Sequence, residues 1–375
     1  MMQAYRLRPA IVCLAAGKSQ LIVIEKAKEL GLSVIAVDRD PNAPGFALSD
    51  EKIELSTYDA TPIINKLYSL KDKYKLIGVV NRASGPPVVT AAKICQVFEL
   101  PGVPPKSASI IVNKSQLMAA CSGRGIATPA CQAVSSLEDI NYEHLDLPCI
   151  VKPSLSLVGK KGVRLVLKKD SLPEAFMAAC QAAMNGIVNV EEFVPGRDVS
   201  LMGVVVKGQL HCITLLDELN VTDSNGNIKG VGFAIPSVFS GQPEEASIIG
   251  MAKKIVDSFK LDTTAFNMSC RCESRGTPRL VEIHLDLGGD LILDALIPES
   301  TSFDVLEFMF RALTGEKPVL QNITFNPVAV IFGEGEGMVS ERPYNILTAQ
   351  DRTSLERSLL LTQRQIYGQN IIFGL

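Results

Sequence analysis

The sequence lacks the features that mark several other classes of protein. Its net charge is only −3 over 375 residues and its basic side chains are scattered, so nothing predicts binding to nucleic acid or to an acidic membrane surface. No apolar run approaches the ~18 residues that a membrane helix needs. Residues 1–9 lead directly into an expected strand and not into a signal sequence. These absences favour a soluble, cytoplasmic protein.

Paired cysteines are also missing. The nine cysteines are an odd number and stand singly inside apolar segments, as Cys13, Cys95 and Cys212 do, which is typical of buried reduced thiols. Cys270 and Cys272 are close, but a lone C-x-C has no second pair to complete a zinc site. The sequence therefore predicts neither a disulfide framework nor a cysteine-bound zinc ion.

The first expected strand, residues 10–16, lacks the glycine patterns of two common nucleotide loops. A P-loop needs a glycine five positions before Gly17, where Val12 stands inside the strand. The G-x-G-x-x-G repeat is absent as well, which argues against a nicotinamide-dependent oxidoreductase. Asp38 is then a turn residue, a substrate contact or a ribose ligand, and Arg82 either contacts a substrate carboxylate or caps a loop.

Strand and helix patterns alternate along the first hundred residues. The expected strands are residues 10–16, 33–37 and 76–80, and the expected helices are residues 19–30, 61–74 and 86–98. Farther along the chain, the polar, glycine-bearing residues 217–230 predict a mobile loop, and residues 302–313 predict a helix. Such alternation predicts a parallel sheet covered on both faces. With 375 residues and 47% hydrophobic side chains, the chain is long and apolar enough for two or three domains with sizeable cores.

A hairpin that binds an anion is predicted between two apolar runs, residues 148–151 and 163–167. Its tip is rich in hydroxyl side chains and glycine, which leave backbone N–H groups free to face phosphate oxygens, and in lysine, which adds positive charge. A strand that ends in the acidic pair Glu191-Glu192 follows. Each feature alone has a purely structural interpretation as a turn or a solvated strand end. Their order and spacing favour a binding site.

A second informative stretch consists of two expected strands, residues 264–272 and 279–287. Because side chains alternate along a strand, Glu282, His284 and Asp286 share one face. A row of acid, imidazole and acid on a sheet is costly unless it binds something. The structural alternative is an ion pair between Glu282 and Arg271 across the two strands.

These stretches resemble the ATP-grasp superfamily, which includes carboxylate-amine ligases, the carbamoyl-phosphate synthase large chain and biotin carboxylase. The resemblance covers roughly residues 9–337. It is strongest at Lys152-Pro153, in the segment from Glu191 to Asp198, and at Glu282 with Gly288-Gly289. It implies an α/β fold of the α+β ATP-grasp type, in which a degenerate Rossmann-like parallel-sheet domain precedes a two-lobed ATP-grasp domain. The implied boundaries are 1–106, 107–200 for the linker and small lid subdomain, and 201–375.

The resemblance also implies the site residues. Glu192 to Val194 would lie against adenine, Asp198 would bind the ribose, and Arg271 would orient a substrate carboxylate. The implied ATP contacts are Lys114, Lys152, Ser154, Ser156, Gly159, Lys160, Gly162, Glu191, Glu192, Phe193, Val194 and Asp198. The implied metal ligands for Mg²⁺ or Mn²⁺ are Glu282, His284 and Asp286.

Three residues depart from the family pattern. Ser269 stands where the first metal carboxylate is expected, His284 where asparagine is, and Asp286 where arginine is. One hypothesis is an ATP-dependent ligase that activates a small-molecule carboxylate as an acyl phosphate and joins it to an amine. The other is a catalytically degenerate nucleotide sensor or partner subunit. The oligomeric state stays open, with a homodimer as the commonest soluble assembly.

Overall fold

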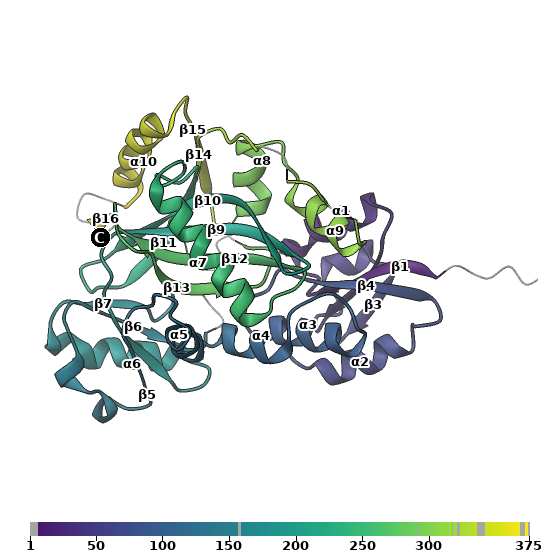
Figure 1. Ribbon diagram of the computed structural model, residues 1–375, viewed down its shortest axis with the longest axis horizontal. Coiled ribbons are helices and arrows are strands. Elements are labelled where there is room, and N and C mark those ends of the chain that lie inside the picture. Colours follow the sequence, from purple (N-terminus) through teal and green to yellow (C-terminus); the bar gives the residue numbers. More distant parts are fainter. Residues whose placement is uncertain are drawn as a thin grey trace, which may run out of the picture.

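The computed structural model describes residues 7–156, 159–289, 291–316, 318–320, 323–335, 342–367 and 372–373. It has three sheets, which follow one another along the chain and define an N-terminal lobe, a small lobe and a central lobe. In Figure 1 the N-terminal lobe (purple to blue) and the small lobe (blue to teal) lie at opposite ends of the central lobe, joined by the helices α4 (Pro105–Val112) and α5 (Lys114–Ser122). The expected domain boundaries stay predictions.

The N-terminal lobe contains a four-stranded parallel sheet in the order β3-β2-β1-β4. Its strands are β1 Arg8–Leu14, β2 Ser33–Asp38, β3 Glu51–Glu54 and β4 Tyr74–Asn81, and its helices are η1 Lys18–Gln20, α1 Leu21–Glu29, η2 Pro44–Leu48, α2 Ala60–Tyr68 and α3 Pro86–Val97. Ile11 and Cys13 pack into one core, and Ala10, Val12 and Leu14 into another. The sheet is therefore buried on both faces, as its continuous apolar runs predict.

The small lobe carries the predicted hairpin in a four-stranded antiparallel sheet, ordered β5-β8-β6-β7. Cys149 pairs with Val166 and Val151 with Arg164, which confirms the hairpin. The strands are β5 Cys131–Val134, β6 Cys149–Pro153, β7 Arg164–Val166 and β8 Val188–Glu192. The helices are α4 Pro105–Val112 and α5 Lys114–Ser122 in the linker, then η3 Leu137–Asp139, η4 Tyr142–His144, η5 Lys169–Ser171 and α6 Leu172–Ala182.

The central lobe is an eight-stranded sheet in the order β13-β12-β9-β10-β11-β14-β15, with β16 paired to β10. Its strands are β9 Arg197–Val206, β10 Gln209–Thr222, β11 Ile228–Ile235, β12 Thr264–Cys272, β13 Arg279–His284, β14 Val328–Phe332, β15 Tyr344–Thr348 and β16 Ile372–Phe373. Its helices are α7 Pro243–Phe259, the π-helix η6 Ile292–Leu296, α8 Ile297–Ser300, α9 Val305–Leu313 and α10 Arg352–Tyr367. None of the helices formed by the described residues could cross a membrane.

Three sequence-based predictions about elements were wrong. The polar stretch 217–230, expected as a mobile loop, is mostly strand, because β10 continues to Thr222 and β11 begins at Ile228. Its first polar side chain, Asp217, is buried and accepts a hydrogen bond from Ser237 Oγ at 2.5 Å, so polarity there reflects internal bonding. The helices expected at 61–74 and 302–313 are shorter, the second because Asp304 caps α9 by accepting from the Glu307 N–H at 2.8 Å.

Candidate active site

Three lysines from the linker and the small lobe form ion pairs where these elements meet the central sheet. The pairs are Lys152 Nζ to Glu191 Oε2 at 2.8 Å, Lys114 Nζ to Glu282 Oε2 at 3.1 Å, and Lys160 Nζ to Glu218 Oε2 at 3.2 Å. Each pair joins two different elements of the fold. The structure thus brings together the three lysines that the sequence predicted as phosphate contacts.

Lys152 lies on β6 beside β8, which carries Glu191. The side chains are 5% and 4% exposed, and Glu191 also accepts a hydrogen bond from Asn189 Nδ2 at 2.9 Å. Burial by itself would lower the pKa of Lys152, but the charge and the hydrogen bond of Glu191, together with the charge of Glu282, raise that pKa. A permanently charged cation therefore stands at the end of β6, where the predicted hairpin loop begins.

Lys114 is the first residue of α5, and the cap of that helix ties it to the hairpin. Asn113 caps α5 by accepting from the Gln116 N–H at 3.1 Å, and it also accepts from the fully buried hydroxyl of Ser154 at 2.9 Å. The Lys114 N–H donates to the Ser154 carbonyl at 2.9 Å. Ser154, predicted as a phosphate contact, therefore connects the two lysine-bearing segments.

The β6–β7 loop, residues 154–163, rests on the turn between β10 and β11. The Ile228 N–H donates to the Val163 carbonyl at 3.1 Å, and the Leu165 N–H to the Gly226 carbonyl at 2.8 Å. Ser156 is half-buried and Gly159 exposed, whereas a Cβ on Gly162 would approach Ala182 Cβ to 2.9 Å. Gly162 is thus also required for packing on α6. Residues 157–158 of this loop lie outside the described residues.

The predicted adenine hinge leaves β8 next to Arg271. Its guanidinium donates to the Val194 carbonyl at 2.6 Å, to Asp198 at 2.9 Å and to the Gly196 carbonyl, and lies 5.2 Å from the centre of the Phe193 ring. These contacts position the hinge. Arg271 thus pairs with Asp198, and Glu282 with Lys114, which argues against the structural alternative of an ion pair between Arg271 and Glu282. The proposed contact of Arg271 with a substrate stays a prediction.

Two further hinge carboxylates have partners. Glu192 accepts from Arg279 at 3.0 Å and from the Ala130 N–H at 3.1 Å. Asp198, predicted as the ribose contact, accepts from Asn220 Nδ2 at 2.9 Å in addition to Arg271. Both carboxylates are therefore held in place before any ligand is bound.

Glu282, His284 and Asp286 lie in a row, as their alternation predicts. His284 Nε2 is 3.3 Å from Glu282, and His284 Nδ1 is 3.9 Å from Asp286. Burial would raise the pKa of Glu282, but the charges of Lys114, His284 and Lys152 hold it well below its usual range. Among the described residues, no three His, Cys, Asp or Glu side chains are arranged to hold a metal ion.

The site contains one carboxylate that the sequence did not single out, Glu218 of β10. Its Oε1 accepts from the hydroxyls of Ser200 at 2.5 Å and Ser269 at 2.6 Å, opposite the bond to Lys160. Burial would raise the pKa of Glu218, but Lys160 and the two hydroxyls lower it. Glu218 could have been noticed as an acidic residue in a strand-like apolar run. The polarity of residues 217–230 suggested a loop instead.

Two polar residues of the N-terminal lobe have structural roles. Asp38 accepts from the backbone N–H groups of Ala16 at 2.8 Å and Asp40 at 2.9 Å, which makes it a turn residue. The Arg82 side chain is 2% exposed, pairs with Asp294, and donates to the Gly288 carbonyl at 2.8 Å. Arg82 therefore fastens loops together and is not available for a substrate carboxylate.

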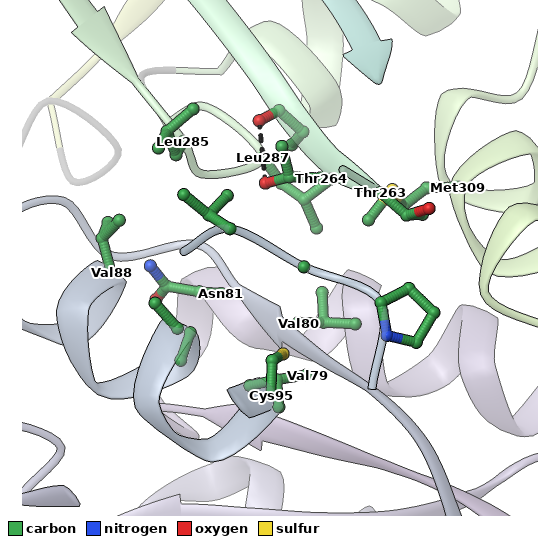
Figure 2. A pocket seen from close by; sticks show the side chains of 16 residues that line it. Val79, Val80, Asn81, Val88, Cys95, Thr263, Thr264, Leu285, Leu287 and Met309 are labelled. Carbon is green, nitrogen blue, oxygen red and sulfur yellow. Dashed lines mark hydrogen bonds between the residues drawn. The ribbon is translucent and has the colours of Figure 1, made fainter. Parts of the chain in front are cut away.

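A cavity between the N-terminal and central lobes is too small to be the site. Figure 2 shows Asn81, Cys95 and Val88 facing Leu285 and Leu287 across it, and its volume is about 40 Å³. That volume has room for little more than one water molecule. A wider groove of about 250 Å³, partly lined by Asn113 and Leu155, opens beside the start of the β6–β7 loop.

Sequence comparison finds partial relatives, and no protein-family model matches the chain. The chain is 29% identical over 200 residues to formate-dependent phosphoribosylglycinamide formyltransferase of Methanocaldococcus jannaschii, covering 50% of this chain and 49% of that protein. The same enzyme of Histophilus somni is 27% identical over 189 residues, covering 49% and 47%. The matches span about half the length of these curated relatives.

Solved structures match over nearly the whole chain. L-amino acid ligase from Bacillus licheniformis superposes with a TM-score of 0.76 at 17% identity, covering 98% of this chain and 99% of that one. N5-carboxyaminoimidazole synthetase from Staphylococcus aureus, complexed with ADP, superposes with a TM-score of 0.74 at 15% identity, covering 96% and 98%. With the lobes and the lysine-bearing hairpin described above, these matches identify the chain as a protein of the ATP-grasp fold.

Proposed function

We propose that the chain is an ATP-dependent ligase that activates a small-molecule carboxylate and joins it to an amine. The observation that carries the proposal is the convergence of Lys114, Lys152 and Lys160, each paired with a carboxylate. A polyphosphate entering this junction would replace the carboxylates as partner of the lysines. The activities named for the matched proteins, a ligase and a synthetase among them, support the same class of reaction.

The nucleotide would lie between the small lobe and the central sheet. Adenine would rest against the backbone of 192–194 and the ribose on Asp198, with the phosphates under the β6–β7 loop. Glycine and hydroxyl residues of that loop offer backbone N–H groups to the phosphate oxygens. The hydrogen bonds from the loop to the β10–β11 turn support a closed loop that excludes water from the phosphates.

Glu282 is suited to be a ligand of a divalent cation that binds together with the nucleotide. Mg²⁺ usually takes one or two carboxylates plus phosphate oxygens, so a group of three protein ligands is not required. The charge of Glu282 is secured by Lys114 and His284, and its face of the sheet points toward the three lysines. Mg²⁺ or Mn²⁺ bound there would offset negative charge on the phosphates.

The chemistry would then proceed in two displacements. A carboxylate oxygen of the substrate attacks the γ-phosphorus, the bond to ADP breaks, and Lys114 and Lys152 offset charge on the transferring phosphoryl group. The amine next attacks the carbonyl carbon of the acyl phosphate, phosphate leaves, and the amine loses a proton. Positioning and electrostatics provide most of the catalysis in such a transfer.

The test is release of ADP and phosphate from ATP in the presence of pairs of small carboxylates and amines, starting with amino acids. Release that requires both substrates, and that Lys152→Ala lowers by about 100-fold or more, is the expected result. Lys161→Ala is the matched control, because Lys161 is an exposed lysine of the same loop. Nucleotide binding without release for any pair would contradict the ligase.

The second candidate is a nucleotide sensor without catalysis. It is favoured by Ser269, which stands in place of an expected metal carboxylate, and by Asp286, which stands in place of an expected arginine. Asp286 is buried and accepts from the hydroxyl of Ser84 at 2.8 Å, so it connects the central lobe to the N-terminal lobe. Nucleotide binding that metal ions do not strengthen would favour the sensor.

A further inference from the structure

Glu218 is brought beside Ser269 by the register of three neighbouring strands. Glu282 of β13 pairs with Ser269 of β12, which pairs with Ser200 of β9, which pairs with Leu216 of β10. Glu218 lies two residues beyond Leu216 and therefore on the same face of the sheet. Its carboxylate accepts directly from the Ser269 hydroxyl at 2.6 Å.

Glu218 and Glu282 thus lie on the same face of the sheet, on strands at opposite sides of β12, which carries Ser269. Their side chains are 11% and 24% exposed. Each is neutralised by a lysine from outside the central sheet, Lys160 for Glu218 and Lys114 for Glu282. Both lysines belong to the set proposed above to bind phosphate, so both carboxylates would need another cation once phosphate takes those lysines.

We propose that Glu218 provides the second protein carboxylate for the divalent cation that accompanies the nucleotide, in place of the carboxylate absent at Ser269. This inference rests on the proposed function. Glu218 and Glu282 would each contribute oxygen, the preferred ligand of Mg²⁺, and the phosphates would complete the coordination. Glu218 comes from a different strand than the residue it replaces, which is why the sequence pattern does not reveal it.

Asp286 is the other acid that could replace the missing carboxylate, and its contacts argue against that role. Its Oδ2 accepts from the Ser84 hydroxyl at 2.8 Å, and its Oδ1 from the Gly288 N–H at 3.0 Å. Both donors lie in loops next to the N-terminal lobe. Glu218, in contrast, is bonded to Ser269 itself and to a lysine of the β6–β7 loop.

Lys160 would exchange partners when the nucleotide binds. Without nucleotide, its ammonium group offsets the charge of Glu218 at 3.2 Å. With nucleotide, the ammonium group would bind phosphate and the cation would take over Glu218. Glu218 therefore links the release of Lys160 to the arrival of the cation.

The test measures the affinity for a non-hydrolysable ATP analogue with and without Mn²⁺ by calorimetry, and Mn²⁺ binding by its magnetic resonance signal. Without metal, we expect Glu218→Gln to bind the ATP analogue as tightly as the wild type or more tightly. The factor by which Mn²⁺ strengthens binding of the analogue should fall about tenfold or more, the size typical of a lost metal-site contact. Glu174→Gln is the control, because Glu174 pairs with Arg164 near the same loop but is 69% exposed.

A rescue variant separates a ligand from a merely structural residue. Glu218→Gln combined with Ser269→Glu moves the carboxylate to the neighbouring strand, and we expect it to restore the Mn²⁺ effect. Glu218→Asp keeps the charge and shortens the side chain, and it should give an intermediate Mn²⁺ effect if Glu218→Gln folds poorly. An unchanged Mn²⁺ effect in the Glu218 variants overturns the inference, whereas absence of nucleotide binding by the wild type overturns the proposed function instead.

Discussion

Lys152 and Glu191 lie 2.8 Å apart with side chains 5% and 4% exposed, so neither charge has water to stabilise it. Removing one partner of such a pair leaves the other charged and buried, whereas removing both charges is far less costly. This pair therefore contributes to stability as well as to the site.

We predict that Lys152→Met lowers the free energy of unfolding by about 3–5 kcal/mol, measured by urea denaturation. The double variant Lys152→Met/Glu191→Gln should regain most of that loss, because no unpaired charge remains. It should still fail to bind nucleotide. Equal stability of the single variant and the wild type would show that the pair is not buried as described.

His284 makes a pH-dependent contribution to the stability of the folded state. Burial would lower its pKa, but Glu282 and Asp286 raise it to about 9 from the usual 6.5. Since the folded state binds the proton more tightly, this stabilisation is complete below about pH 6.5 and is lost as the pH rises through about 9. The chain has three histidines, so ring signals can be followed individually by NMR. We predict one that titrates near 9 and disappears in His284→Gln; ordinary titration of all three would contradict the prediction.

The sequence could indicate Lys114, Lys152 and Glu282, because each stands in a stretch that resembles an ATP-grasp motif. Glu218 could not be found in this way, since residues 217–230 are polar enough to suggest a loop. Its role depends on hydroxyls from two other strands. Such a contact exists only after the sheet has formed.

At the level of elements, the β6–β7 loop and the start of β7 are hydrogen-bonded to the β10–β11 turn. Gly226 lies in that turn with a φ of +79°, and a Cβ there would come within 2.1 Å of the Leu165 carbonyl oxygen. Any side chain at this position would push the loop off the turn.

We predict that Gly226→Ala speeds proteolytic cleavage of the β6–β7 loop and weakens nucleotide binding. Gly186→Ala is the matched control, because Gly186 has a φ of +67° but open space around its Cα. Both variants should lose about 1–2 kcal/mol from the left-handed backbone, and only Gly226→Ala should change the cleavage rate. Equal rates in the two variants would show that the loop does not depend on this contact.

Strands were easier to predict than element ends. The apolar runs of β1, β2 and β4 were sufficient to predict these strands, because both faces of that sheet are buried. Helix ends depend instead on local turns and capping side chains, as at the end of α2 (Tyr68) and the start of α9 (Val305). The spacing of apolar residues does not reveal these features.

At the scale of the molecule, all nine cysteines are free thiols, spread over the three lobes. Burial raises the pKa of several to about 12, above the ordinary value of 9.0; these are Cys13, Cys95, Cys121, Cys131 and Cys212. Thiols kept protonated in the folded state do not react readily with disulfide reagents.

We predict that these five thiols react at pH 8 only after denaturation, measured with a chromogenic disulfide reagent. Because their folded pKa lies above the unfolded one, their contribution to stability is complete below about pH 9 and is lost as the pH rises toward 12. Rapid reaction of these thiols in the native protein would contradict the packing around these side chains.

On the function proposed above, a nucleotide binds between the small lobe and the central sheet, held by three lysines and a cation at Glu282. The most direct measurement is calorimetric titration of the full chain with a non-hydrolysable ATP analogue, with and without Mg²⁺. We predict binding that Mg²⁺ strengthens, that Lys152→Ala abolishes and that Lys161→Ala leaves unchanged. Absence of binding under either condition would contradict the claim.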